Sequence, residues 1–384
     1  MTLVTENAPL TAFCERISGD AFVAVDTEFI RERTFWSNLC VVQIAGSAEA
    51  AAIDTLAEGI DLFPVFRLMA DPGVLKVFHA GRQDIEIFYH LTGEIPAPIF
   101  DTQVAAMVCG FGESASYETL VAQIAKTQID KSSRFTDWAH RPLTRRQIDY
   151  ALSDVVHLRT VYDDLACRLE KNGRTGWLAE EMAVLTDPKT YRVDPREAWR
   201  RLKTRSHSRR HLAVLREVAA WRETEAQARN VPRNRILRDE ALLEIASHTP
   251  RTKEDLARSR SVSKGTAEGP AGSAILKAVA NGLEIPEQDL PELPPRAETA
   301  PGIRPLVELL KVLLKMKCEE HSVAQKLVAN TEDLEAIAAD DSALVPALQG
   351  WRRAIFGEDA LALKHGKLAL TVRNRSVQLV PPGV

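Results

Sequence analysis

The chain has 384 residues, of which 45% are hydrophobic and 27% are charged, and these values are ordinary for a soluble globular protein of two or three domains. Its net charge of −4 excludes a uniformly basic protein, so any nucleic acid must be bound by a local patch. No apolar run reaches the ~18–20 residues that a membrane helix needs, and no secretory signal is visible, which predicts a cytoplasmic protein without a membrane partner.

The first half of the chain alternates between predicted strands and predicted helices. Four stretches rich in β-branched and apolar residues are expected to be strands: 22–30, 39–46, 51–55 and 75–80. Helices are expected at 60–71, at 82–93 with its end at Gly93, and from an N-cap at Asp101 or Thr102 to Gly110. This order predicts an α/β domain that ends near residues 170 to 195.

The second half of the chain is predicted to be helical, with short helices at 211–230, 238–249 and 252–260. Segment 261–274, "SVSKGTAEGPAGSA", is expected to be a flexible loop because of its glycines and serines. Six prolines between Pro286 and Pro305 predict a semi-rigid linker before a last helical unit. The expected domains are therefore 1–195, 205–287 and 306–384, with a linker at 288–305.

Acidic residues stand in positions that suggest chemistry. Asp26 and Glu28 are two apart on a predicted strand, so they share one face at roughly 6–7 Å, where two like charges repel each other. Asp84 lies in the first turn of a helix, and Tyr150 and Asp154 are four apart on another. Each motif alone has a plainer interpretation: a solvated strand end, a helix cap, a surface contact.

Together these acids form a set of hard oxygen ligands, which suits Mg²⁺ or Mn²⁺. Two such ions about 3.5–4 Å apart can activate a water molecule and stabilise the leaving oxygen of a phosphodiester. Bound cations would also neutralise the repulsion between the carboxylates. The nine histidines form no zinc-binding motif such as HExxH.

Three stretches, "VAVDTEF", "VFHAGRQDIEIF" and "YALSDV", resemble the exonuclease motifs of the DEDD superfamily, in the subclass with a tyrosine in the third motif. The linking segments 28–45, 100–107 and 136–155 resemble the ribonuclease D family more narrowly, especially in the Trp-Arg-Pro-Leu neighbourhood before Tyr150. Residues 215–256 resemble an HRDC domain, a helical nucleic-acid-binding module. Residues 350–370 resemble the divergent C-terminal HRDC-like unit of the same family.

The resemblance implies a ribonuclease H-like (DnaQ-like) exonuclease domain with a mixed sheet, followed by two small all-α HRDC-type domains. It implies a monomeric 3′–5′ exoribonuclease that uses two divalent cations, releases nucleoside 5′-monophosphates and matures the 3′ ends of tRNA precursors and other structured RNAs. The implied metal ligands are Asp26, Glu28, Asp84 and Asp154, with Asp26 bridging both ions, and Tyr150 would orient the attacking water. Two alternatives stay open: a DNA-directed 3′–5′ exonuclease, and a binding module whose nuclease site is inert.

RNA is expected to be held by base stacking and by phosphate contacts. Segment 200–238 contains 12 Lys or Arg residues and three acidic residues, so it can form a basic patch, although a solvated helix face is the alternative. Core packing is the alternative for the aromatic candidates, and His79 is expected to be a hydrogen-bonded core histidine. The candidate RNA-contacting residues are Phe29, Phe35, Trp36, Trp138, Arg209, Arg210 and Arg222.

Overall fold

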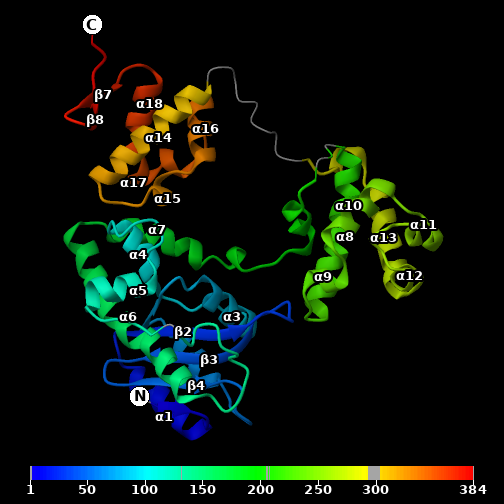
Figure 1. Ribbon diagram of the computed structural model, residues 1–384, viewed down its shortest axis with the longest axis horizontal. Helices are drawn as coiled ribbons and strands as arrows, with labels where there is room; N and C mark the ends of the chain where they lie inside the picture. Colours follow the sequence, from blue (N-terminus) through cyan, green and yellow to red (C-terminus); the bar gives the residue numbers. More distant parts are fainter. Residues whose placement is uncertain (1, 131, 205, 207, 293–302, 384) are drawn as a thin grey trace. The chain divides into compact units, whose positions relative to one another are not determined.

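The computed structural model describes residues 2–130, 132–204, 206, 208–292 and 303–383 (Figure 1). The chain divides into two compact units. One comprises residues 1–28, 40–187 and 296–384, and the other comprises 29–39 and 188–295. In the described part of the chain, every helix is too short or too polar to span a membrane.

The first unit is built on a six-stranded sheet. Its strands lie in the spatial order β1 (Thr2–Val4), β4 (Ala50–Asp54), β3 (Asn38–Ala45), β2 (Phe22–Ile30), β5 (Leu75–Phe78) and β6 (Ile99–Asp101). The pairs β1–β4, β2–β5 and β5–β6 are parallel, whereas β3–β4 is antiparallel, so the sheet is mixed. The four predicted strands are all present. The sequence did not predict β1 and β6, because three residues are too few to establish an alternating pattern.

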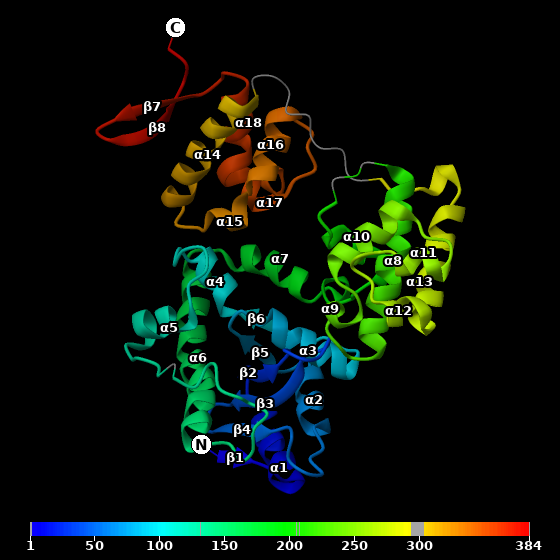
Figure 2. The same cartoon turned by 45° about the vertical axis from the view of Figure 1, so that its right-hand side comes forward.

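Helices cover both faces of this sheet. Figure 2 shows α6 (Arg145–Lys171) on one side and α2 (Phe63–Ala70) and α3 (Arg82–Thr92) on the other. Two helices end and begin at the predicted residues. Gly93 ends α3 with φ of 76°, and the Asp101 carboxylate caps the next helix by accepting hydrogen bonds from backbone N–H groups. The remaining helices of this part are α1 (Asn7–Ile17), α4 (Thr102–Val108), α5 (Tyr117–Leu120) and α7 (Thr175–Leu185).

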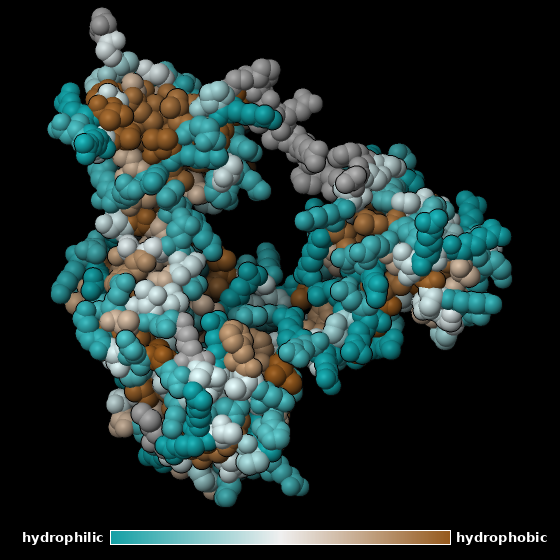
Figure 3. Space-filling view, viewed as in Figure 1, coloured by the Kyte–Doolittle hydropathy of each residue, from teal (hydrophilic) through white to brown (hydrophobic). Residues whose placement is uncertain are grey.

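The second unit is a helical bundle. It contains a 3₁₀ turn (Pro195–Arg201) and the helices α8 (Arg209–Ala228), α9 (Arg233–Ile236), α10 (Asp239–His248), α11 (Lys253–Ala257), α12 (Lys264–Glu268) and α13 (Pro270–Glu284). Its core includes Trp199 of the 3₁₀ turn, Leu215 and Val218 of α8, and Leu242 and Ile245 of α10. Most of the surface over these helices is hydrophilic in the view of Figure 3.

Segment 261–274 is not the predicted flexible loop, because it contains α12 and the first turn of α13. Ser263 caps α12 by accepting a hydrogen bond from the Thr266 backbone N–H, and Pro270 starts α13. A Cβ atom added at Gly272 would lie 1.9 Å from the Ala267 carbonyl oxygen. The glycine therefore allows two helices to approach closely, and it does not mark a mobile segment.

The last part of the chain packs with the first unit. Its elements are α14 (Ile303–Glu320), α15 (Gln325–Val328), α16 (Thr331–Ala339), α17 (Gly350–Arg352), α18 (Glu358–Lys364) and the hairpin β7 (Ala369–Arg373)–β8 (Ser376–Val380). The Trp177 ring of α7 stacks on Trp351 with ring centroids 4.2 Å apart, and Arg352 forms an ion pair with Glu180. The hairpin was not predicted, and most of the predicted proline-rich linker (293–302) lies outside the described residues.

Candidate active site

Three of the predicted acidic ligands converge in the first unit. Asp26 and Glu28 lie near the end of β2, directly after the buried Val23, Ala24 and Val25. Asp154 comes from α6, more than a hundred residues later in the chain. One carboxylate oxygen from each of the three residues lies within 4.8 Å of the others. This spacing lets one cation contact all three side chains.

Asp84 lies next to this group but makes a different contact. It is in the first turn of α3 and is only 6% exposed, and its carboxylate accepts a hydrogen bond from the Thr27 hydroxyl. Its negative charge contributes to the raised pKa values of Asp26 and Glu28, which places it near both. Asp84 is outside the group of three with ligand spacing, so a contact through water fits its position better than a direct one.

Burial makes the negative charges of this cluster unfavourable. It is the largest cause of the raised pKa of Asp26, and the carboxylates of Asp84, Asp154 and Glu28 raise that pKa further. Burial followed by the neighbouring carboxylates raises the pKa of Glu28 to about 9. Burial also raises the pKa of Asp84 to about 6 and that of Asp154 to about 7. A divalent cation would supply the missing positive charge, and the all-oxygen donor set suits Mg²⁺ or Mn²⁺.

Tyr150 lies one helical turn before Asp154, and its hydroxyl donates a hydrogen bond to the Asp154 carboxylate. Burial and the negative charges of Asp154, Glu28 and Asp26 raise the pKa of Tyr150 above its ordinary value. The hydroxyl therefore stays protonated at neutral pH. It can orient a water molecule by hydrogen bonding, but it cannot remove a proton from that water.

A cavity of about 300 Å³ lies beside the carboxylates and is lined by Asp26, Tyr150 and Asp154. It is also lined by Tyr117 and Arg134, which belong to none of the three acidic motifs. Arg134 lies in an irregular loop, and Tyr117 starts the four-residue helix α5, so no periodic pattern marks either of them. The exposed Arg134 guanidinium lowers the pKa values of Glu28 and Asp154, and its positive charge faces a cluster of negative ones.

The comparisons with known proteins agree with this geometry. A family model described as "3'-5' exonuclease" matches residues 1–170, and an "HRDC domain" model matches residues 211–279. Ribonuclease D of Granulibacter bethesdensis is 53% identical over 385 residues, which cover 100% of this chain and 97% of that relative. Ribonuclease D of Nitrobacter hamburgensis is also 53% identical, over 98% of both chains.

The chain belongs to the ribonuclease D family. Among solved structures, the crystal structure of Escherichia coli RNase D, an exoribonuclease involved in structured RNA processing, superposes with a TM-score of 0.79 at 28% identity. That comparison covers 94% of this chain and 98% of the other. Membership confirms the predicted ribonuclease H-like exonuclease domain with a mixed sheet, followed by a helical region with an HRDC domain. It also confirms the predicted metal-dependent 3′–5′ exoribonuclease class.

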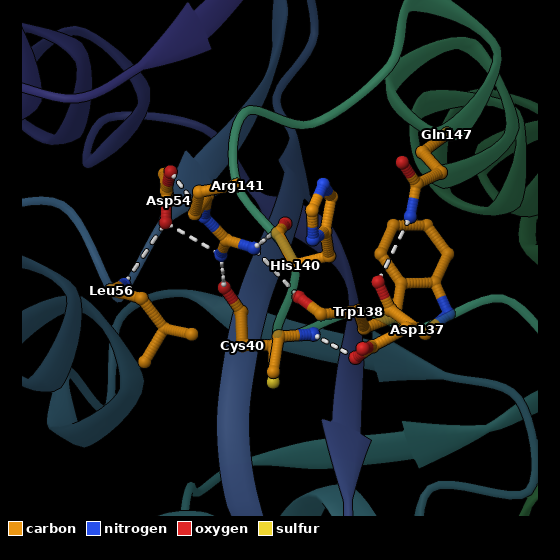
Figure 4. Close-up of polar contacts among 9 residues, drawn as sticks. Cys40, Asp54, Leu56, Asp137, Trp138, His140, Arg141 and Gln147 are labelled. Atoms are coloured by element: carbon orange, nitrogen blue, oxygen red, sulfur yellow. Dashed lines mark hydrogen bonds and ion pairs between the residues drawn. The ribbon is translucent and has the colours of Figure 1, made fainter.

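The Trp-Arg-Pro-Leu neighbourhood that resembles ribonuclease D has a structural role in this chain (Figure 4). The Arg141 guanidinium donates to both carboxylate oxygens of Asp54 at 2.7 Å and to the carbonyl oxygen of Cys40 at 2.9 Å. It also donates to the carbonyl oxygens of Trp138 and His140. Arg141 thereby ties the loop before α6, the helix of Tyr150 and Asp154, to strands β3 and β4.

We expect Arg141→Ala to lower the free energy of unfolding by about 3 kcal/mol, because the substitution leaves the buried Asp54 carboxylate without its cation. Urea denaturation followed by tryptophan fluorescence measures this loss. The control is Arg145→Ala, which breaks a solvent-exposed pair with Asp149 and should cost less than about 1 kcal/mol. Equal losses in the two variants would contradict a stabilising role specific to Arg141.

The predicted aromatic contacts with RNA are only partly compatible with the structure. Trp138 is 3% exposed and packs in the core, so the prediction that it stacks on a base was wrong. His79 is hydrogen-bonded to the Thr102 hydroxyl, as expected, although it lines the cavity as well. Phe29 and Trp36 are half-buried, and Trp36 packs edge-on against the buried Phe35. Contact of RNA with Phe29 and with Trp36 stays a prediction.

The three arginines predicted to contact RNA phosphates instead bind carbonyl and carboxylate groups of the protein. Arg222 is 3% exposed and donates to the Leu237 carbonyl and the Asp239 carboxylate, so it does not belong to an open basic patch on the helix surface. Arg209 donates to the Leu290 carbonyl and pairs with Glu292. Arg210 likewise donates to carbonyls at the end of α13 and pairs with Glu287. The structure gives Arg209 and Arg210 a role in closing the bundle.

Proposed function

We propose that this chain shortens RNA from its 3′ end by hydrolysing the terminal phosphodiester bond and releasing nucleoside 5′-monophosphates. In this proposal Asp26, Glu28, Asp84 and Asp154 hold two divalent cations, Mg²⁺ or Mn²⁺. The observation that supports it most is the convergence of Asp26, Glu28 and Asp154 within ligand spacing beside a cavity. A purely structural role does not require three half-buried carboxylates of raised pKa to lie so close together.

The chain's own residues are suited to this reaction. The chemistry supplied by two bound divalent cations is activation of a water molecule and stabilisation of the leaving oxygen. Tyr150 holds its proton and orients the water from its position beside Asp154. Thr27 fixes the Asp84 carboxylate through its hydroxyl.

The charge balance of the site gives Arg134 a role. Four carboxylates and two divalent cations are together neutral, so the negative phosphodiester lacks a positive partner. Arg134 lines the same cavity as Asp26 and Asp154, and its side chain is exposed. We assign it to contact a phosphate oxygen of the terminal nucleotides, because guanidinium groups bind phosphates well.

The proposed substrates are more specific than the activity that defines the family. We infer that the physiological RNAs are tRNA precursors and other structured RNA 3′ ends, on which the enzyme acts as a cytoplasmic monomer. The support is the family resemblance, together with the Escherichia coli relative, which is an exoribonuclease involved in structured RNA processing. The five filled motif positions support an active site over an inert binding module.

The test is to incubate 5′-labelled RNA and DNA of the same sequence with the full chain. Each nucleic acid carries either a free 3′ hydroxyl or a 3′ phosphate, and the buffer contains Mg²⁺, Mn²⁺ or EDTA. We expect stepwise shortening of RNA from the free end and no reaction in EDTA. Equal shortening of DNA would favour the DNA-directed alternative. Binding without shortening under all conditions would favour the inert module.

A further inference from the structure

A second cavity lies within the second unit. It has a volume of about 410 Å³, which is in the size range of about 300–1,000 Å³ typical of ligand sites. Segment 29–39, the 3₁₀ turn before α8, Arg222 of α8, the start of α9 and the first residue of α10 contribute to its wall. Four arginines line it: Arg31, Arg201, Arg222 and Arg233.

This cavity carries excess positive charge. Asp239 lines the cavity too and pairs with Arg222 at 2.6 Å. The fully buried Glu223 pairs with Arg233 at 2.5 Å and with Arg201 at 3.7 Å. The guanidinium groups of Arg201, Arg222 and Arg233 thus share two carboxylates, which leaves one positive charge among these five side chains. Because the whole chain has a net charge of −4, this excess is a local property of the cavity.

Some donors of these arginines are not used by the protein. Arg222 is 3% exposed, and among the described residues its Nε atom is buried without a hydrogen-bond partner. A buried donor of this kind is unfavourable unless a ligand or a water molecule accepts from it. The Arg201 side chain is 59% exposed, so its guanidinium is also accessible. Both residues line the same cavity, and an anionic ligand there would face their positive charge.

The segment that closes the cavity is fixed in place. The side-chain oxygen of Asn230 accepts the backbone N–H groups of Phe35 and Trp36, at 3.1 and 3.0 Å. The Arg233 guanidinium lies over the Phe35 ring, 4.5 Å from its centroid, and Arg31 donates to the Phe35 carbonyl at 3.0 Å. The arginines are therefore held by packing and hydrogen bonds before any ligand arrives, which reduces the entropy lost on binding.

We propose that this cavity binds a phosphate group of the RNA backbone, with Arg201 and Arg222 as its principal donors. The inference rests on the proposed function, because RNA is the polyanion that such an enzyme meets. A guanidinium group can donate two parallel hydrogen bonds to two oxygens of one phosphate. Thr34 and Asn234 line the same cavity and offer further polar groups to a phosphate or a ribose. An acidic peptide is a different ligand class, and its binding is an outcome of the test.

The test measures binding without catalysis. A fluorescein-labelled 20-nucleotide single-stranded RNA with a 3′ phosphate is titrated with the full chain in EDTA at several salt concentrations. We expect Arg201→Gln to reduce the slope of log K against log salt by about 0.7, which is the value for one phosphate contact to a single strand. If binding at 1 M salt is unchanged, that slope corresponds to about fivefold weaker binding at 0.1 M salt. Arg201→Lys keeps the charge and should keep most of the slope.

The matched control is Arg200→Gln. Arg200 is adjacent in sequence, its side chain is 52% exposed and pairs with Glu197, and it does not line the cavity. Equal effects of the two glutamine variants, or no effect of either, would overturn the proposal. It would also be overturned if an acidic peptide, and not the RNA, lost affinity in Arg201→Gln.

Hydrolysis of RNA by the unaltered chain is measured in parallel with Mn²⁺. No hydrolysis together with the expected binding result would refute the proposed function and leave the phosphate site standing.

Discussion

Asp26→Asn is expected to abolish RNA shortening while leaving the fold intact. Asp26 lies in the middle of the carboxylate cluster, and its pKa is raised by burial and then by Asp84, Asp154 and Glu28. The amide has nearly the same shape as the carboxylate but cannot supply its negative charge to a cation. If about 4 kcal/mol of metal-dependent transition-state stabilisation is lost, the rate falls roughly 10³-fold, because each 1.36 kcal/mol is a factor of ten.

The measurement is single-turnover shortening of 5′-labelled RNA in Mg²⁺ and in Mn²⁺. Asp149→Asn is the matched control, because Asp149 is adjacent to Tyr150 on α6 but is exposed and paired with Arg145. The control should retain nearly full activity. Asp26→Asn protein that shortens RNA within tenfold of the normal rate would refute the assignment of Asp26 as a metal ligand.

The metal-free protein is expected to lose stability as the pH rises from about 5 to about 9. In the folded state the pKa of Glu28 is raised to about 9, that of Asp154 to about 7 and that of Asp84 to about 6. An unfolded carboxyl group titrates near pH 4, so over this range the folded state binds more protons than the unfolded state. The stabilising contribution of these protons is complete below about pH 4 and disappears as each folded pKa is passed.

The expected loss is several kcal/mol, because one pKa unit corresponds to about 1.4 kcal/mol. Added Mg²⁺ should reverse it, and the rise in melting temperature that Mg²⁺ causes should increase with pH, since the cation binds the deprotonated carboxylates. Thermal denaturation in EDTA and in Mg²⁺, at intervals between pH 5 and pH 9, measures both effects. Asp26→Asn should weaken both, whereas Asp149→Asn should change neither. A Mg²⁺ effect that is independent of pH would argue against metal binding by this cluster.

Local patterns in the sequence predicted the framework around the site. The apolar residues that precede Asp26 fixed β2, and the helix signals at Gly93 and Asp101 ended α3 and started α4 as expected. The acidic residues and Tyr150 could be named because each belongs to a short motif, and the family resemblance supplied their order. These features are readable from sequence because they depend on neighbours within about four residues along the chain.

Other features could be decided only by tertiary packing. Nothing local distinguishes Arg222, which is buried and paired with Asp239, from Arg201, which lines the same cavity but has an exposed side chain. Trp138 entered the core, and Gly272 permits a close helix contact in a segment whose composition suggested a loop.

Patterns among neighbouring residues thus suffice for the strands and helices around the site, for the acidic residues and for the family. Which charges meet depends on the folded chain: Arg134 lies near the carboxylates, Arg141 pairs with Asp54, and Arg31 lines one cavity with other arginines of the second unit. Ion pairing and burial depend on distances between residues far apart in the chain, whereas a sequence pattern records only near neighbours.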